Sequence, residues 1–293
     1  MRSIILLLSM LTVMSGQTTQ TVSALNARID SIIAAHSGRY AVAVKGLQSS
    51  FFLYRNEHES FHAASTMKTP VMIEVFKQAE QKKFSLNDSI VIRNSFKSII
   101  DGSEYSLDFS DDSDDGIYHE IGKKLTIAQL MFKMITVSSN LATNILIERV
   151  GPDNVMRTMR SLGLNDIQVL RGVEDGKAFK AGKNNTTTAY DLCAIFEMIA
   201  RKSIASSDAC NDMIRILTAQ EFKDMIPAKL PSDVIVAHKT GSITNVQHDS
   251  GIVYLPDGRS YILVILSKEL KNNADGIACA ADISRTIYDF MVK

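Results

Sequence analysis

The sequence contains no tryptophan, few cysteines and no surplus of charge of either sign. Its 293 residues carry 32 basic and 32 acidic side chains, so the formal net charge is zero. The sequence has no surplus of basic residues that would favour a nucleic-acid partner. It also has no long run of like charges that would indicate an interaction tail. The lack of tryptophan excludes a tryptophan-based platform for sugars. Apolar residues make up 45% of the chain, which is typical of an ordinary globular protein with a substantial core.

The three cysteines do not indicate a metal site. The chain has no Cys-x-x-Cys pair and no histidine cluster, so we expect neither a structural nor a catalytic metal. The odd number leaves at least one thiol free, and the sequence does not decide any disulfide pairing. We expect Cys193, Cys210 and Cys279 to be buried as small apolar residues.

Long apolar runs are also rare, and the clear example lies at the N-terminus. Residues 1–20 combine Arg2, an apolar run over residues 4–14, and the small residues Ser15 and Gly16, which predicts a signal peptide. The run is short for a membrane span, and no cysteine follows it to carry a lipid. We therefore expect an exported protein, periplasmic or secreted, without a stable membrane span after the signal is removed. A buried N-terminal helix or a membrane anchor is the alternative.

Apolar periodicity places strands at both ends of the chain and helices in the middle. Strands are expected over residues 40–45, 50–54, 234–240, 251–255 and 261–266, and helices over about 23–38, 65–81, 125–150, 186–199 and 274–291. This order predicts an α/β (α+β) sandwich with a five-stranded, mainly antiparallel sheet built from both termini and an inserted all-helical lobe. We assign residues 21–293 to one domain, with the helical lobe at roughly 85–215.

Two irregular segments interrupt the expected helices. Residues 110–116 are rich in aspartate, and clustered carboxylates could suit calcium. Their spacing is not that of an EF-hand, so a solvated loop is the favoured interpretation. Residues 166–185 lack regular apolar repeats, which predicts a long loop of the kind that often carries function.

Three short motifs indicate the chemistry. They are Ser65-Thr-Met-Lys68, Ser138-Ser-Asn140 and Lys239-Thr-Gly241. Residues three apart share a helix face, so Ser65 and Lys68 are expected side by side, as a nucleophile and its base must be. Each motif alone is weak because such short patterns occur by chance. The three motifs in this order and at these separations form a strong signal.

This motif set resembles that of the class A serine β-lactamases and the wider penicillin-binding superfamily. The resemblance runs from about residue 24 to the C-terminus. It departs from the family at Ser139, where an aspartate thought to support the local fold is usual, and His238 resembles a subgroup trait. The resemblance implies the same five-stranded fold, a β-lactam substrate opened by acyl transfer, and no cofactor.

The resemblance also implies a role for the residues of the first two motifs. Ser65 would attack the lactam carbonyl, and Lys68 would either accept its proton or, if charged, orient it. The sequence does not decide between these two states of the lysine. Ser138 would pass a proton to the lactam nitrogen, and Asn140 would hydrogen-bond Lys68 and the amide side chain of the substrate.

The third motif would hold the substrate. Lys239 and Thr240 would bind its carboxylate, because a positive charge and a hydroxyl suit an anion. Gly241 would let the strand lie close to the ligand, and the backbone N–H groups of Ser242 and Ser65 would form an oxyanion hole. In an ideal pleat Thr240 lies opposite Lys239, so a local twist is expected to bring Thr240 to the site.

A glutamate in the long loop corresponds to the family's deacylating base. The family pattern is Glu-x-x-Leu-Asn, whereas Glu174-Asp-Gly-Lys-Ala178 keeps only the glutamate, and Asp175 is a competing carboxylate. The family ties this loop with an Arg–Asp pair, and here Arg171 is matched by Asn185. The loop must then be held in another way, and a solvated loop carboxylate is the alternative for Glu174.

Together these features predict an exported, monomeric serine hydrolase that opens β-lactam rings through a Ser65 acyl-enzyme and releases it with water directed by Glu174. A D-Ala-D-Ala-type peptidase or esterase on the same scaffold is one alternative. A β-lactam sensor that stays acylated is another, and it should be tethered to a membrane-spanning signalling part.

Overall fold

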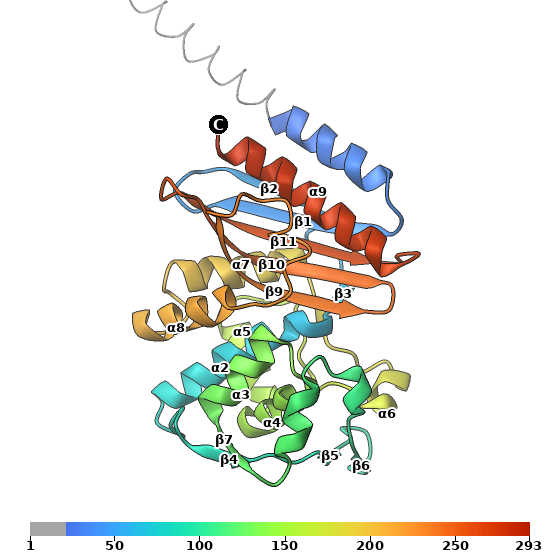
Figure 1. The fold of residues 1–293 in the computed structure, drawn as a ribbon, viewed down its shortest axis with the longest axis vertical. Helices are drawn as coiled ribbons and strands as arrows, with labels where there is room; N and C mark the ends of the chain where they lie inside the picture. Colours follow the sequence, from blue (N-terminus) through green and yellow to red (C-terminus); the bar gives the residue numbers. More distant parts are fainter. Residues whose placement is uncertain (1–21) are drawn as a thin grey trace, which may run out of the picture.

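A five-stranded sheet forms the centre of the protein in the computed structural model, which describes residues 22–293 (Figure 1). The predicted signal peptide lies outside the described residues. The strands follow the order β2-β1-β11-β10-β9, and every neighbouring pair is antiparallel. The predicted sheet built from both ends of the chain is therefore confirmed. The strand bounds are β1 Arg39–Gly46, β2 Phe52–Arg55, β9 Ile235–Ile243, β10 Val246–Tyr254 and β11 Ser260–Lys268.

The sheet is buried on both faces because its side chains alternate between two apolar cores. On β11, every second residue from Ile262 to Leu266 joins the core shared with the helical lobe. The residues between them, from Tyr261 to Ile265, join a second core under helix α9, Asn273–Met291. Successive strand residues point to opposite faces, so one apolar strand serves both cores.

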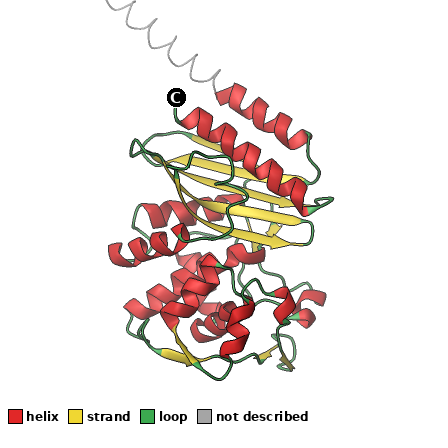
Figure 2. Ribbon diagram, viewed as in Figure 1, coloured by secondary structure: helices red, strands yellow, loops and turns green. Residues whose placement is uncertain are grey.

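Helices cover both faces of this sheet (Figure 2). On one face lie α9 and the helical residues 22–34. On the other face lies α7, Ala189–Ala200, which contacts β1, β10 and β11, and α8, Ser207–Thr218, contacts β9. Within residues 22–293, no helix is both long and apolar enough to cross a bilayer.

The helical lobe lies beyond α7 and α8 in Figure 1. Helix α2 runs through it and contacts α3, α4 and α5. The α-helices of the lobe are α2 Lys68–Glu80, α3 Ile127–Thr136, α4 Asn140–Val150, α5 Pro152–Ser161 and α6 Gly176–Lys180. The 3₁₀ helices are η1 Ala64–Met67, η2 Phe109–Asp111 and η3 Asp115–Glu120. Short paired strands complete it: β3 Phe61–His62 with β8 Thr186–Thr187, β4 Ser89–Val91 with β7 Lys124–Thr126, and β5 Phe96–Lys97 with β6 Glu104–Tyr105.

Several boundaries differ from the predicted ones. The helix expected from Ser65 is the 3₁₀ turn η1 followed by α2. Strand β10 begins five residues earlier than expected, at Val246, because its ladder with β9 continues to a two-residue turn at 244–245. Helix α8 was not predicted, although its buried residues 209, 210, 213, 216 and 217 follow helical spacing.

Candidate active site

A cavity of about 910 Å³ opens where η1, the start of α4, the long loop and β9 meet. Residues from all three motifs and from the long loop line it. Those among the predicted site residues are Ser65, Ser138, Asn140, Glu174, Thr240 and Ser242. Lys68 and Lys239 are fully buried beside them. The fold thus gathers the predicted residues from four separate segments at one cavity.

The turn that carries Ser65 has a strained backbone. Ala64, directly before it, has a φ of +45°. This left-handed conformation costs a residue other than glycine about 1–3 kcal/mol. The Ala64 N–H donates to His62 Nδ1 at 3.1 Å, and the Thr66 hydroxyl donates to the Ala63 carbonyl at 2.6 Å. These bonds fix the turn and leave the Ser65 side chain half-buried at the cavity wall.

The amine of Lys68 is engaged with the second motif. Its Nζ donates to the Ser138 carbonyl at 2.7 Å, to Ser138 Oγ at 3.2 Å and to Asn140 Oδ1 at 2.9 Å. In the described part of the chain, no hydrogen bond joins Lys68 to Ser65, so the contact suggested by their spacing is not made. Burial lowers the pKa of Lys68 to about 7, while the charges of Asp112 and Glu174 oppose this shift. A substantial share of the amine is therefore neutral near pH 7.

A second buried amine reaches the same serine hydroxyl. Lys239 Nζ lies 3.0 Å from Ser138 Oγ and 3.0 Å from the Thr240 carbonyl. Burial holds the pKa of Lys239 well below its usual range, and the charge of Lys68 lowers it further, whereas Asp249 opposes the shift. Both lone pairs of the Ser138 hydroxyl can accept from these amines, which leaves its own proton free for a third partner.

The two sides of β9 have different tasks. Thr240 and Ser242 lie on one side of the pleat and line the cavity, whereas Lys239 lies on the other side and reaches Ser138. Thr240 lines the cavity from the side opposite to Lys239, and the local twist expected for it stays a prediction. A Cβ at Gly241 would lie 3.2 Å from both the Ser65 and the Thr66 backbone nitrogens. Glycine therefore permits the close approach of β9 to η1, which differs from the expected approach to a ligand.

Asn140 joins the lysine to the loop glutamate. Its Oδ1 accepts from Lys68, and its Nδ2 donates to Glu174 Oε1 at 2.8 Å. Glu174 is half-buried, with a left-handed φ of +61°. Burial raises the pKa of its carboxyl, and the hydrogen bond from Asn140 opposes the rise. Glu174 thus lines the cavity as a half-buried, hydrogen-bonded carboxylate.

The side-chain amide of Asn185 links the two ends of the long loop in place of an Arg–Asp pair. Asn185 Oδ1 accepts the N–H groups of Leu170 at 2.8 Å and Arg171 at 3.2 Å, and its Nδ2 donates to the Arg171 carbonyl at 2.9 Å. The Arg171 guanidinium donates to the carbonyls of Gly172 and Lys183, both at 2.9 Å. This network is the other means of holding the loop that the sequence required.

Asn144, which no sequence motif indicated, anchors the segment next to the glutamate. Its Oδ1 accepts the Val173 N–H at 2.7 Å and its Nδ2 donates to the Val173 carbonyl at 3.0 Å. A Cβ at Gly172 would lie 2.3 Å from this Oδ1. The available signal was spacing, because Asn144 follows Asn140 by four residues and shares its helix face.

Asp175 has a structural task. Its carboxylate accepts from Ser98 Oγ and the Ile99 N–H, both at 2.9 Å, and caps α6 by accepting the Ala178 N–H at 3.0 Å. Both carboxylate oxygens are thereby occupied, so Asp175 is poorly placed to compete with Glu174.

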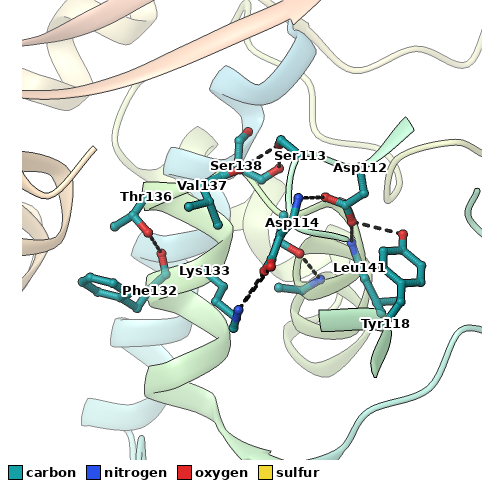
Figure 3. A network of polar contacts seen from close by, with 12 residues as sticks. Asp112, Ser113, Asp114, Tyr118, Phe132, Lys133, Thr136, Val137, Ser138 and Leu141 are labelled. Atoms are coloured by element: carbon teal, nitrogen blue, oxygen red, sulfur yellow. Dashed lines mark hydrogen bonds and ion pairs between the residues drawn. The ribbon is translucent and has the colours of Figure 1, made fainter. Parts of the chain in front are cut away.

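Most of the acidic segment 110–116 is exposed, as predicted, but two of its aspartates are buried and bound to the protein (Figure 3). Asp112 and Asp114 are each only 9% exposed. Asp112 accepts backbone N–H groups at the start of α4, and Asp114 pairs with Lys133 on α3 at 3.0 Å. Among residues 22–293, no three or more His, Cys, Asp or Glu side chains are arranged to hold a metal ion.

The cysteines lie apart from this site. Cys193, Cys210 and Cys279 are all buried and none forms a disulfide. Their predicted role as small buried residues is confirmed.

Comparison with known proteins identifies the family. A family model described as the β-lactamase enzyme family matches residues 24–291. A β-lactamase of Bacteroides uniformis is 26% identical over 285 residues, which cover 93% of each chain. The extended-spectrum β-lactamase PER-1 of Pseudomonas aeruginosa is 24% identical over 308 residues, covering 98% of this chain and 93% of the relative. The crystal structure of a β-lactamase from Sphaerobacter thermophilus superposes with a TM-score of 0.80 and 25% identity, covering 92% of this chain and 98% of that one. The chain belongs to the class A serine β-lactamase family, as its motifs predict.

Proposed function

We propose that this protein hydrolyses β-lactams through a covalent acyl-enzyme on Ser65. The observation that carries the proposal is the convergence of two buried amines, Lys68 and Lys239, on the Ser138 hydroxyl at the wall of the cavity that Ser65 also lines. Acyl transfer requires a nucleophile, a base and a route for a proton to the leaving group. These residues supply all three within one small region.

In the proposed acylation, the Ser65 oxygen attacks the lactam carbonyl carbon and its proton passes toward Lys68. The lowered pKa of Lys68, about 7, makes a neutral amine available as the acceptor. Ser138 then gives its free proton to the lactam nitrogen as the C–N bond breaks. Either amine in contact with Ser138 Oγ can return a proton to it.

The rest of the cavity would bind the substrate. The backbone N–H groups of Ser65 and Ser242 would stabilise the oxyanion, and Gly241 supports this role because it keeps β9 against η1. Lys239 and Thr240 would bind the substrate carboxylate, and Asn140 its amide side chain. Binding of the carboxylate would also favour the charged form of Lys239.

In the proposed deacylation, Glu174 takes a proton from a water molecule that attacks the ester carbonyl. Its raised pKa makes it a stronger base than an exposed carboxylate, and Asn140 fixes its orientation. The ester C–O bond then breaks, and the proton returns to Ser65.

One observation favours the peptidase or esterase alternative. Ala178, in the position where the family pattern has asparagine, is fully buried in α6 and offers no polar side chain to hold a water beside Glu174. Deacylation would then be slow, and a protein that remains acylated by penicillin acts as a penicillin-binding hydrolase.

We further propose that the domain spans residues 21–293, that it acts as a monomer, and that residues 1–20 direct its export to the periplasm or the medium. The residues proposed for the site all come from one chain, so a monomer is sufficient for the proposed activity. Export is supported by the signal-like composition of the first twenty residues.

Intact-mass measurement after exposure to penicillin, combined with nitrocefin turnover, tests the proposal. The wild type should turn over nitrocefin and show no adduct at steady state, and Ser65→Ala should show neither turnover nor adduct. Glu174→Gln should accumulate a penicilloyl adduct because its deacylation slows by about a hundredfold to ten-thousandfold. The matched control is Glu104→Gln, an exposed carboxylate on β6, which should behave as wild type. An adduct on Ser65→Ala would refute the nucleophile, and an adduct on the wild type itself would favour the alternative.

A further inference from the structure

The acidic segment holds the turn that presents Ser138 from both sides (Figure 3). Asp114 pairs with Lys133 on α3, before the turn. The Ser113 hydroxyl donates to the Val137 carbonyl at 2.7 Å, within the turn. Asp112 accepts from backbone N–H groups after the turn. Three consecutive residues therefore contact the end of α3, the turn and the start of α4.

The contacts of Asp112 are the most extensive of the three. Both of its carboxylate oxygens lie 2.9 Å from the backbone nitrogen of Asn140. Its Oδ2 also accepts the Leu141 N–H at 2.9 Å and the Tyr118 hydroxyl at 3.1 Å. The first N–H groups of a helix have no partner within the helix, and the positive end of its dipole favours an anion. The side chain of the helix cap, Ser139, accepts the Ala142 N–H at 3.2 Å and not the two N–H groups before it. Asp112 therefore accepts the backbone N–H groups of Asn140 and Leu141, which have no partner within the helix.

The residue that Asp112 holds is also the one that joins the catalytic groups. Asn140 Oδ1 accepts from Lys68 Nζ and Asn140 Nδ2 donates to Glu174 Oε1. A small displacement of the Asn140 backbone would therefore move both contacts at once. The buried charge of Asp112 also acts on these groups without touching them.

We propose that Asp112 is a positioning residue for the reaction, which fixes Asn140 against Lys68 and Glu174 and sets by its negative charge the pH at which they become active. This role rests on the proposed function. Asp112 raises the pKa of Lys68 and the pKa of Glu174, because a nearby anion favours the protonated form of each. Loss of the Asp112 charge should therefore lower the pKa of both Lys68 and Glu174. The other ionisable groups around them are Lys239 on β9, Tyr118 on η3, and Asp108 and Asp111 at η2.

The test is the pH dependence of the rate at which penicillin acylates the protein, followed by rapid quench and intact mass. Asp112→Asn keeps the shape of the side chain and removes its charge. The maximal rate should fall by about tenfold to a hundredfold through misplacement of Asn140. The midpoint of the rising limb should move about one pH unit lower. A purely structural role would lower the rate equally at every pH.

Two further variants complete the design. Asp112→Glu keeps the charge and displaces the N–H contacts, so its maximal rate should fall while its midpoint stays at the wild-type pH. Asp115→Asn removes the same charge from an exposed residue of the same segment and should match the wild type in both respects.

An unmoved midpoint in Asp112→Asn, or a shift as large in Asp115→Asn, would overturn the role of Asp112. Should Asp112→Asn fail to fold, Asp112→Glu decides on the positioning of Asn140: a lowered maximal rate supports this positioning, and a wild-type maximal rate overturns the role. A wild-type protein that forms no adduct on Ser65 under any condition would overturn the proposed function and this role with it. An adduct with an unmoved midpoint would overturn the role alone.

Discussion

Gly172→Ala should destabilise the loop that carries Glu174 without changing a residue of the three motifs. The added Cβ would lie 2.3 Å from Asn144 Oδ1 and 2.8 Å from its Cγ, distances that no stable contact tolerates. Gly172 does not adopt a left-handed φ, so the clash and not backbone strain is the effect being tested. The amide of Asn144 must move, and both of its bonds to Val173, at 2.7 and 3.0 Å, are then lost or stretched.

The size of the effect follows from these two contacts. At about 1 kcal/mol for each hydrogen bond, the free energy of unfolding should fall by about 2 kcal/mol. At roughly 2–4 °C per kcal/mol for a protein of this size, Tm should fall by about 4–8 °C. Deacylation should slow by about tenfold or more, because a small displacement of Val173 also moves Glu174. Acylation should change less, since Ser65 and Lys68 lie outside the loop.

Thermal unfolding and intact mass under penicillin measure these effects together. The matched control is Gly176→Ala, at the start of α6 in the same loop, where an added Cβ meets no heavy atom within 4 Å. Alanine is favoured over glycine in a helix by about 1 kcal/mol, so the Tm of this control should stay level or rise slightly. If Gly172→Ala unfolds at the wild-type temperature and releases penicillin at the wild-type rate, Asn144 does not anchor Val173 and the reasoning is wrong.

Three further predictions concern charge, pH and the thiols. Lys239→Ala should lower kcat/KM for carboxylated lactams by about tenfold to a hundredfold, from the loss of a charge-assisted contact of about 1.5–3 kcal/mol; equal losses on neutral esters would contradict carboxylate binding. The acylation rate of the wild type should rise as Lys68 loses its proton around pH 7, because the neutral amine is the proposed base; a flat profile from pH 6 to pH 8 would speak against this role. Thiol alkylation of the native protein should leave nitrocefin turnover nearly unchanged, because all three cysteines are buried away from the cavity, and a loss that substrate prevents would show otherwise.

The sheet could be predicted from the sequence where its side chains are apolar, and less well where they are polar. On β11 the apolar run from Tyr261 to Leu266 indicated the strand directly. The first half of β10 contains His248 and Asp249, which are fully buried, so hydrophobic patterning placed its start too late. Their partners are the His62 carbonyl, from a distant part of the chain, and the His238 ring on the neighbouring strand β9. Polar residues of this kind belong to the interior only when the fold supplies such partners.

The candidate site shows the same division. The motif residues were found because their types and spacing already describe a reaction. Asp112 was not found, because the N–H groups that it accepts lie 28 and 29 residues away on another element. An aspartate among other aspartates resembles a solvated residue until the turn that it supports is in place. The contact between Lys68 and Ser138 was likewise outside the reach of a rule based on spacing along one helix.

The pairing of the sheet also has a consequence for the order in which the molecule can fold. Arg39 at the start of β1 pairs with Lys268 at the end of β11, and β9 joins the sheet only through β10, which in turn joins through β11. The hairpin of β1 and β2 is synthesised early, but its partner strand β11 is available only when nearly all of the chain has been synthesised. Folds dominated by such distant pairings form slowly, since a long loop must close before its contacts stabilise it. A chain that stops before β11 should therefore leave the hairpin of β9 and β10 unconnected to β1 and β2, and it should be inactive and prone to aggregation instead of weakly active.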